Sequence, residues 1–169
     1  MGKKTRSLTL SALFAALIVI SLYIASIWPS GQLGIVAFSS IFIAAAVVEG
    51  GLGSSLYVYV VSSALCMLLT PDKTAPLLFI LFFGYYPIVK CLIERLRRKV
   101  YQWILKLLVF NAALTVIWIF LRGLLFSFAG SLPGAAFIFV GGNIIFALFD
   151  YGFSKVIWLY IERISHSKY

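Results

Sequence analysis

Six long apolar runs occupy almost the whole of this 169-residue chain. A helix needs roughly 20 apolar residues to cross the hydrocarbon part of a bilayer. The runs predict six membrane-spanning helices at about residues 7–28, 33–48, 52–69, from 76 to the basic link that begins at 95, 103–128 and 135–161. We therefore expect an all-α membrane protein, with one six-helix bundle covering residues 1–169 as its single domain.

Basic residues are concentrated on alternate links between these runs. The N-terminus, the fourth link and the C-terminal end together carry Lys3, Lys4, Arg6, Arg95, Arg97, Arg98, Lys99, Lys106, Lys155, Arg163 and Lys168. The opposite side has Lys73, with Arg122 near it in depth. Because cytoplasmic loops are enriched in Lys and Arg, both termini are predicted to be cytoplasmic. The net charge of +9 then reflects topology, and no nucleic-acid partner is expected.

The composition also requires a bilayer. With 63% apolar and 11% charged residues, the chain has too few polar side chains to cover a soluble sphere. The first run is longer than the apolar core of a secretory signal, so we interpret it as a retained span. The predicted location is the cell membrane of a bacterium, with the chain crossing several times.

The sequence carries few groups of the kind that enzymes use. The only histidine, His166, lies in the C-terminal tail, and the five carboxylates are scattered among helix ends and links. Neither a Ser-His pair nor a histidine metal site can be assembled inside the membrane from these residues. We expect no catalytic activity, no metal and no cofactor.

Two charged residues within the apolar runs need partners, because a charge at mid-membrane costs at least about 2.5 kcal/mol. Lys90 on the fourth span and Asp150 on the sixth have similar depth, and we predict that they form an ion pair with a structural role. Snorkelling of Lys90 to the interface is one alternative. A proton or ion pathway is a second, and it is less favoured because no other acidic residue lies at mid-depth to continue a relay. Asn143 lies seven residues before Asp150, on the same helix face, and Gly142 beside it would allow another helix to approach closely.

The fourth span is interrupted by Gly84-Tyr85-Tyr86-Pro87. Pro87 is expected to kink the helix, and interrupted helices in transporters usually line a cavity. Tyr85 and Tyr86 could provide flat walls for a solute there. Arg122 in the fifth span either snorkels to the outer interface or donates hydrogen bonds to a solute that enters from outside.

Small residues recur on one face of the first span, where Ala12 and Ala16 are four residues apart. Such spacing lets two helix backbones approach closely in lipid. From spacing alone, packing inside the bundle is favoured over docking to another subunit.

Residues 3–17 have the pattern K-K-x-R-x-L-T-x-x-A-L-F-A-A-L, and residues 143–151 read N-I-I-F-A-L-F-D-Y. This sequence resembles the S components of energy-coupling-factor (ECF) vitamin transporters, which are small six-helix membrane proteins with cytoplasmic ends. The N-terminal pattern is the most specific part of the resemblance, and the length and number of spans extend it to the whole chain.

The resemblance implies a substrate-capture subunit that binds a small vitamin-like or heterocyclic solute from the outer side. Its partners would be a transmembrane coupling subunit, docked against Ala12 and Ala16, and two cytoplasmic ATPase subunits. By position within the family, the solute pocket would draw on Gln32, Asp72, Lys73, Tyr85, Tyr86, Arg122 and Asn143. Motifs specific to thiamine, biotin, folate or cobalamin are absent, so the resemblance implies no particular solute.

Two other functions are compatible with the sequence. A structural or scaffold protein of the cell envelope would use its basic cytoplasmic face for a partner or for anionic lipid. A stand-alone channel or secondary carrier is a third possibility. A secondary carrier should have coupling charges near the midplane, but the polar residues placed there are the uncharged Asn111 and Asn143.

Overall fold

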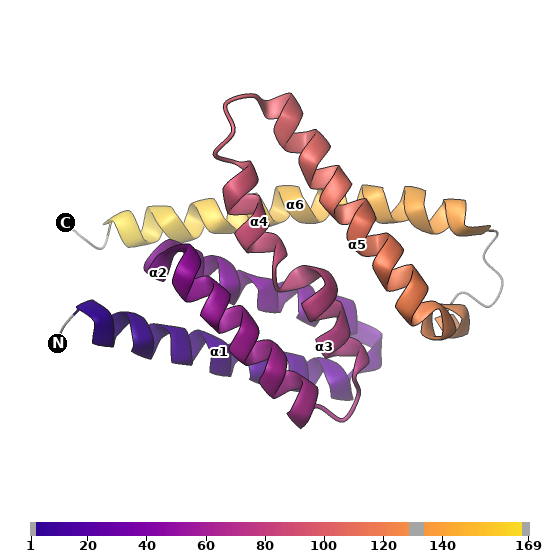
Figure 1. The fold of residues 1–169 in the computed structure, drawn as a ribbon, viewed down its shortest axis with the longest axis horizontal. Helices are drawn as coiled ribbons and strands as arrows, with labels where there is room; N and C mark the ends of the chain where they lie inside the picture. Colours follow the sequence, from indigo (N-terminus) through magenta and orange to yellow (C-terminus); the bar gives the residue numbers. More distant parts are fainter. Residues whose placement is uncertain (1–2, 129–133, 167–169) are drawn as a thin grey trace. The chain divides into compact units, whose positions relative to one another are not determined.

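The computed structural model describes the backbone of residues 3–128 and 134–166, and the side chains of residues 5–28, 30–119 and 139–163. The described chain is helical and contains no strand, which confirms the predicted all-α class (Figure 1). Its elements are α1 (Lys3–Ile27), a 3₁₀ turn (Pro29–Gly31), α2 (Gln32–Leu69), α3 (Thr74–Leu78), a π-helical turn (Phe79–Phe83), α4 (Tyr86–Ile93), α5 (Lys99–Phe128) and α6 (Gly134–His166).

Five stretches of the described residues are long and apolar enough to cross a membrane. They are Thr5–Ile27, Gln32–Leu69, Thr74–Ile93, Lys99–Ile119 and Phe139–Arg163. Many large apolar side chains on these helices face outward; Leu8 is 72% exposed and Leu68 is 80% exposed. An exposed apolar surface of this kind suits a helix in contact with lipid, so the fold fits a membrane protein.

The longest helix, α2, folds back on itself at Gly51. This residue has φ 76° and ψ −175°, a conformation that L side chains rarely adopt. A straight helix of 38 residues would be about 57 Å long. Nevertheless, Gln32 at its start donates a hydrogen bond of 2.8 Å to Asp72, just beyond its end. The two halves of α2 are therefore antiparallel, as Figure 1 shows, and the reversal lies in the predicted break at Glu49-Gly50-Gly51.

By internal contacts, the chain divides into two compact units. The first comprises residues 1–92 and 156–169, and the second comprises residues 93–155. The sequence predicts one domain over residues 1–169, and that remains a prediction.

In the first unit, α1 packs against both halves of α2. The buried face of α1 repeats every three or four residues, which is the spacing of one side of an α-helix. It consists of Phe14, Ala15, Ile18, Leu22 and Ala25. On α2, the buried run Ala44–Ala46 has little side-chain bulk, so the helix backbones can approach closely.

The fully buried serines of α2 bond within their own helix. Ser39 Oγ donates to the Val36 carbonyl (2.6 Å), and Ser62 Oγ donates to the Val58 carbonyl (2.7 Å). Such bonds satisfy a hydroxyl without a partner on another helix. These serines therefore act as small packing residues.

The predicted interruption of the fourth span is present, but it begins earlier than expected. The chain leaves α-helical geometry at the π-helical turn Phe79–Phe83, and Gly84 N donates to the Phe79 carbonyl at 2.7 Å. Pro87 is the second residue of α4. A proline fits there because the first turn of a helix has no internal partner for its N–H group. Pro87 thus helps to start a helix instead of kinking one.

Candidate functional site

Gln32, Asp72 and Thr74 form a polar cluster at the end of the first unit where α2 begins and ends. Gln32 Nε2 donates to Asp72 Oδ2 at 2.8 Å. The other carboxylate oxygen, Oδ1, accepts hydrogen bonds from Thr74 N (3.1 Å) and Thr74 Oγ1 (2.9 Å). The cluster joins the start of α2 to the link before α3. Two predicted solute-binding residues, Gln32 and Asp72, are thus brought together.

Burial raises the pKa of the Asp72 carboxyl, but the three hydrogen bonds from Thr74 and Gln32 outweigh it and keep the pKa below its ordinary value of 3.8. Asp72 is therefore charged at neutral pH.

Lys73, another predicted solute-binding residue, directs its ammonium group to the end of α2. Its Nζ donates to the carbonyls of Met67 (2.8 Å) and Thr70 (2.6 Å). A cation at the C-terminus of a helix satisfies carbonyls that lack internal partners and interacts favourably with the helix dipole. The structure gives Lys73 a capping role.

Tyr59, on the second half of α2, supports the irregular part of the fourth span. Its hydroxyl donates to the Ile80 carbonyl at 3.0 Å, within the π-helical turn. A Cβ atom at Gly84 would lie 2.7 Å from two carbons of the Tyr59 ring, so glycine is required for this close approach. One turn beyond Tyr59, the buried Ser63 Oγ has no hydrogen-bond partner among the described residues. A buried hydroxyl without a partner would gain a hydrogen bond from a water or a polar solute.

Tyr85 and Tyr86, both predicted to contact solute, have different surroundings. Tyr86 is fully buried, and its ring lies 5.0 Å from that of Phe82. Tyr85 is half-buried, with its ring 6.4 Å from Phe82. Tyr85 is therefore the more accessible of the two.

The predicted docking residues Ala12 and Ala16 are both exposed on α1, whereas the neighbouring Ala15 is buried. A groove of about 280 Å³ runs beside Ala12, between α1 and the second half of α2. It is lined by Leu8, Ser11, Ala12, Ala15, Tyr57, Val58 and Val61. Within the first unit, α1 does not use Ala12 or Ala16 in its buried face.

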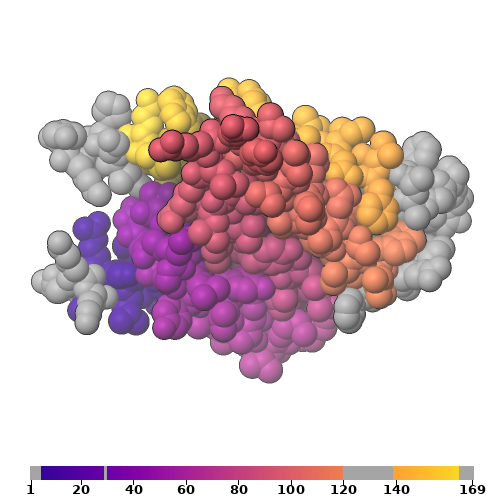
Figure 2. Space-filling model, turned by 45° about the horizontal axis from the view of Figure 1, so that its top comes forward, coloured from indigo at the N-terminus to yellow at the C-terminus, as the bar shows by residue number. Residues whose placement is uncertain are grey.

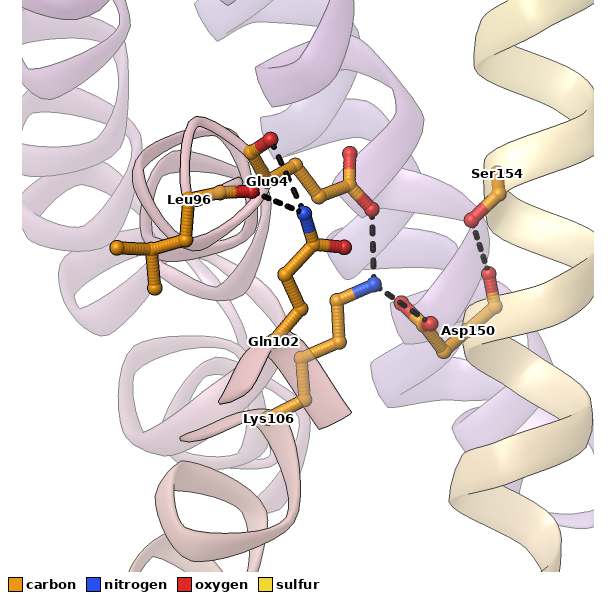
Figure 3. A network of polar contacts seen from close by, with 6 residues as sticks. All are labelled: Glu94, Leu96, Gln102, Lys106, Asp150 and Ser154. Carbon is orange, nitrogen blue, oxygen red and sulfur yellow. Dashed lines mark hydrogen bonds and ion pairs between the residues drawn. The ribbon is translucent and has the colours of Figure 1, made fainter. Parts of the chain in front are cut away.

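In the second unit, Lys106 is held between two carboxylates. Its Nζ donates to Glu94 Oε1 at 2.8 Å and to Asp150 Oδ2 at 2.9 Å, as Figure 3 shows. Lys106 is 6% exposed and Asp150 is 2% exposed, whereas the Glu94 side chain is 43% exposed. From the sequence, Lys106 was predicted to lie on a basic link. This assignment was wrong, because Lys106 lies two turns inside α5 and its side chain points to α6.

The predicted pair of Lys90 and Asp150 would join the two units. Lys90 belongs to the first unit, where it is buried, and Asp150 belongs to the second. The pair remains a prediction.

Asn143 pairs with Asn111 through two hydrogen bonds between α5 and α6. Each Nδ2 donates to the Oδ1 of the other residue, at 3.0 and 3.1 Å, and also to a carbonyl of its own helix. A Cβ atom at Gly142 would lie 3.2 Å from Leu114, so the two helices approach closely here. Asn143 and Asp150 thus share the face of α6 that contacts α5, as expected, but all N–H groups of Asn143 are already used.

Arg122 is part of α5, but its side chain lies outside the described residues. Its predicted contact with solute therefore remains a prediction.

Neither the role of Tyr59 nor the bridging role of Lys106 was predicted from the sequence. The sequence did carry a signal for Lys106. The fifth span was predicted to begin at residue 103, and a lysine inside a membrane span needs a partner. Tyr59 gave no such signal, because a tyrosine in an apolar run usually has only a packing role.

Comparison with family models, with curated proteins and with solved structures gives no match.

Proposed function

We propose that this chain is the substrate-capture subunit of an ECF-type importer in a bacterial cell membrane. It binds a small vitamin-like or heterocyclic solute from outside and passes it inward with a coupling subunit and two ATPase subunits. The observation that carries the proposal is the exposure of Ala12 and Ala16. Small residues four apart favour close helix approach in lipid, and here they are not used within the unit that contains them.

The proposal includes six spans and cytoplasmic termini. The halves of α2, residues 32–50 and 52–69, are each about 27–29 Å long, close to the roughly 30 Å of a bilayer's hydrocarbon core. Counting them as two spans gives six. The basic termini and the basic link after α4 then lie on one side, in agreement with the positive-inside rule. A reporter fused to the C-terminus should be active only as a cytoplasmic reporter.

In this orientation, the Gln32–Asp72 cluster lies at the outer end of the first unit. Solute would meet Asp72, Lys73 and the exposed Trp28 there, and Tyr85 and Ser63 offer polar atoms deeper in the unit. In the second unit, Arg122 is a separate predicted contact of the solute. Arg122→Ala should weaken solute binding and leave the melting temperature of the empty protein nearly unchanged. Undiminished binding would limit Arg122 to an anchoring role.

The decisive experiment combines solute identification with a test of docking. Mass spectrometry of small molecules released from gently purified protein should find one solute in a stoichiometric amount. Ala12→Trp and Ala16→Trp should leave melting and solute binding unchanged, because both positions are exposed. They should abolish uptake and co-purification of a coupling subunit. Ala112→Trp, at an exposed position of α5, is the matched control and should retain both.

Other outcomes would support other functions. A lower melting temperature for Ala12→Trp would indicate internal packing. Normal uptake by a folded Ala12→Trp variant would contradict both the docking face and the importer. Absence of any solute, with normal growth after deletion, would favour an envelope scaffold.

A further inference from the structure

The segment that joins α4 to α5, residues 94–98, is short and, together with Lys99 at the start of α5, strongly basic. Arg95, Arg97, Arg98 and Lys99 all have exposed side chains. In the space-filling view, the rose-coloured stretch around residues 95–105 forms part of the surface that faces the viewer (Figure 2). We refer to Arg95, Arg97, Arg98 and Lys99 as the basic turn.

The one carboxylate of this segment is bound to another residue. Glu94 Oε1 accepts a hydrogen bond of 2.8 Å from Lys106 Nζ, which also binds Asp150. Among the described residues, no salt bridge joins a cation of the basic turn to an acidic side chain. The positive charge of the turn is therefore not neutralised from within the second unit.

The backbone of the segment is held in place from α5. Gln102 Nε2 donates to the carbonyls of Leu96 (2.7 Å) and Glu94 (3.3 Å), as Figure 3 shows. Leu96 N donates to the Ile93 carbonyl at 3.0 Å. Together with the Lys106–Glu94 pair, these bonds fix a compact turn. The cations extend from a fixed backbone, which reduces the entropy lost when they bind a partner.

The side chains around the turn are those of a membrane interface. Leu96, Val100, Tyr101 and Trp103 are 43–69% exposed, and the Arg98 guanidinium carbon lies 6.0 Å from the centre of the Tyr101 ring. Exposed aromatic residues next to cations, at the end of a membrane helix, are typical of the headgroup region. A soluble acidic partner would not require these apolar side chains to be exposed.

We infer that the basic turn is a binding site for the phosphate headgroup of an anionic phospholipid. Each arginine can donate two parallel hydrogen bonds to phosphate oxygens, and Lys99 adds a point charge. Leu96, Val100 and Trp103 would contact the upper part of the acyl chains. This site requires neither a transported solute nor a coupling subunit, so it is independent of the proposed function.

The test measures the preference of the site for phosphatidylglycerol over phosphatidylcholine. A variant with Trp28, Trp118 and Trp158 replaced by Phe leaves Trp103 as the single tryptophan, beside the turn. In vesicles with brominated acyl chains, quenching of Trp103 fluorescence reports which lipid is next to it. Brominated phosphatidylglycerol should quench at a lower mole fraction than brominated phosphatidylcholine, and 0.5 M KCl should reduce the difference.

Two variants with equal net charge distinguish lipid binding at the basic turn from a general attraction of anionic lipid to the positively charged protein. Arg95→Gln/Arg97→Gln/Arg98→Gln removes three charges from the turn. Arg6→Gln/Lys155→Gln/Arg163→Gln removes three exposed charges elsewhere, so both proteins have a net charge of +6 instead of +9. One cation near the surface contributes about a fivefold preference, so the first variant should lose on the order of 100-fold and the second much less.

Gln102→Met tests the role of the fixed backbone without a change in charge. It should reduce the preference for phosphatidylglycerol by about two- to fivefold, because the hydrogen bonds from one side-chain amide to the backbone of the turn are lost. Equal quenching by both lipids in the starting protein would overturn the inference, and so would equal losses in the two triple variants. A turn that instead binds an acidic protein would give the first of these results.

Discussion

In the first unit, the fully buried serines of α2 bond to carbonyls of their own helix, whereas in the second unit buried charged side chains and half-buried asparagines of α5 and α6 bond from helix to helix. Ser39 and Ser62 represent the first arrangement, and Lys106 with Asp150 and Asn111 with Asn143 represent the second. The serines allow close backbone packing, which depends on the size of the side chains. Bonds between helices depend on particular polar partners. The first unit should therefore be sensitive to added bulk and the second to the loss of a polar group.

The largest effect is expected for Lys106→Met. It removes a cation that lies 2.9 Å from the buried carboxylate of Asp150, and breaking a buried pair typically costs about 3–5 kcal/mol of unfolding free energy. The double variant Lys106→Met/Asp150→Asn should recover a large part of this loss. Titration with SDS in mixed micelles would measure the difference. A double variant whose loss equals the sum of the two single losses would show that the side chains do not interact.

A double-mutant cycle of Lys90→Met, Asp150→Asn and the combined variant tests the predicted pair of Lys90 and Asp150. Coupling in that cycle would mean that Asp150 also interacts with Lys90. Purely additive losses would rule out the predicted pair.

Gly84→Ala tests whether added side-chain bulk destabilises the first unit. The new methyl group would lie 2.7 Å from the Tyr59 ring and 2.8 Å from Phe79, and overpacking of this kind typically costs about 1–3 kcal/mol. Gly53→Ala is the matched control, because its Cβ atom would meet nothing within 4 Å. It should raise stability by about 0.5–1 kcal/mol through lower chain entropy. Equal melting temperatures for the two variants would contradict the packing at Tyr59.

Asn111→Leu should cost about 0.6–1.7 kcal/mol, the range measured for hydrogen bonds between membrane helices. The double variant Asn111→Leu/Asn143→Leu should be more stable than Asn111→Leu, because no amide is then left without its partner. Ser62→Ala is the control in the first unit and should change stability by less than about 0.5 kcal/mol. If Ser62→Ala lowers the unfolding free energy as much as Asn111→Leu does, the two units do not differ in their dependence on polar groups.

The smallest effect is expected from acid acting on the Gln32–Asp72 contact. The folded-state pKa of Asp72 lies below its ordinary value of 3.8. Its contribution to stability is therefore fully present above that value and is lost as the pH falls through the lower, folded-state pKa. The melting temperature of Asp72→Asn should depend less on pH below about 4 than that of the unchanged protein. Parallel melting curves for the two proteins would show that Asp72 is not stabilised in this way.

The helical architecture follows from the sequence because apolar runs of spanning length have few alternatives. The break at Glu49-Gly50-Gly51 was predictable for a similar reason, since glycine is the residue that readily adopts the positive φ of Gly51. The shared face of Asn143 and Asp150 follows from helical periodicity. Sequence alone thus predicts long apolar helices, a break between them and shared helix faces.

The partners of polar residues could not be predicted in the same way. Lys106 binds carboxylates 12 and 44 residues away, and the rotation of α5 that makes this possible depends on packing over its whole length. Likewise, the departure from α-helical geometry before Gly84 depends on Tyr59, which is 21 residues from the carbonyl it binds. The proposed solute contacts are least predictable, because they were assigned by position within a family and not by a residue motif.

The reversal of α2 at Gly51 also affects how the chain can be cut or tagged. Proteases and inserted sequences need several exposed residues that can leave regular structure. At Gly51 a single residue departs from helical geometry, so the two halves of α2 should resist nicking and should not accept an epitope tag between them. The segment of residues 94–98 is non-helical and exposed, and it offers Arg95, Arg97 and Arg98 to trypsin. Limited proteolysis should therefore separate the chain after α4 and leave α1 and both halves of α2 in one fragment.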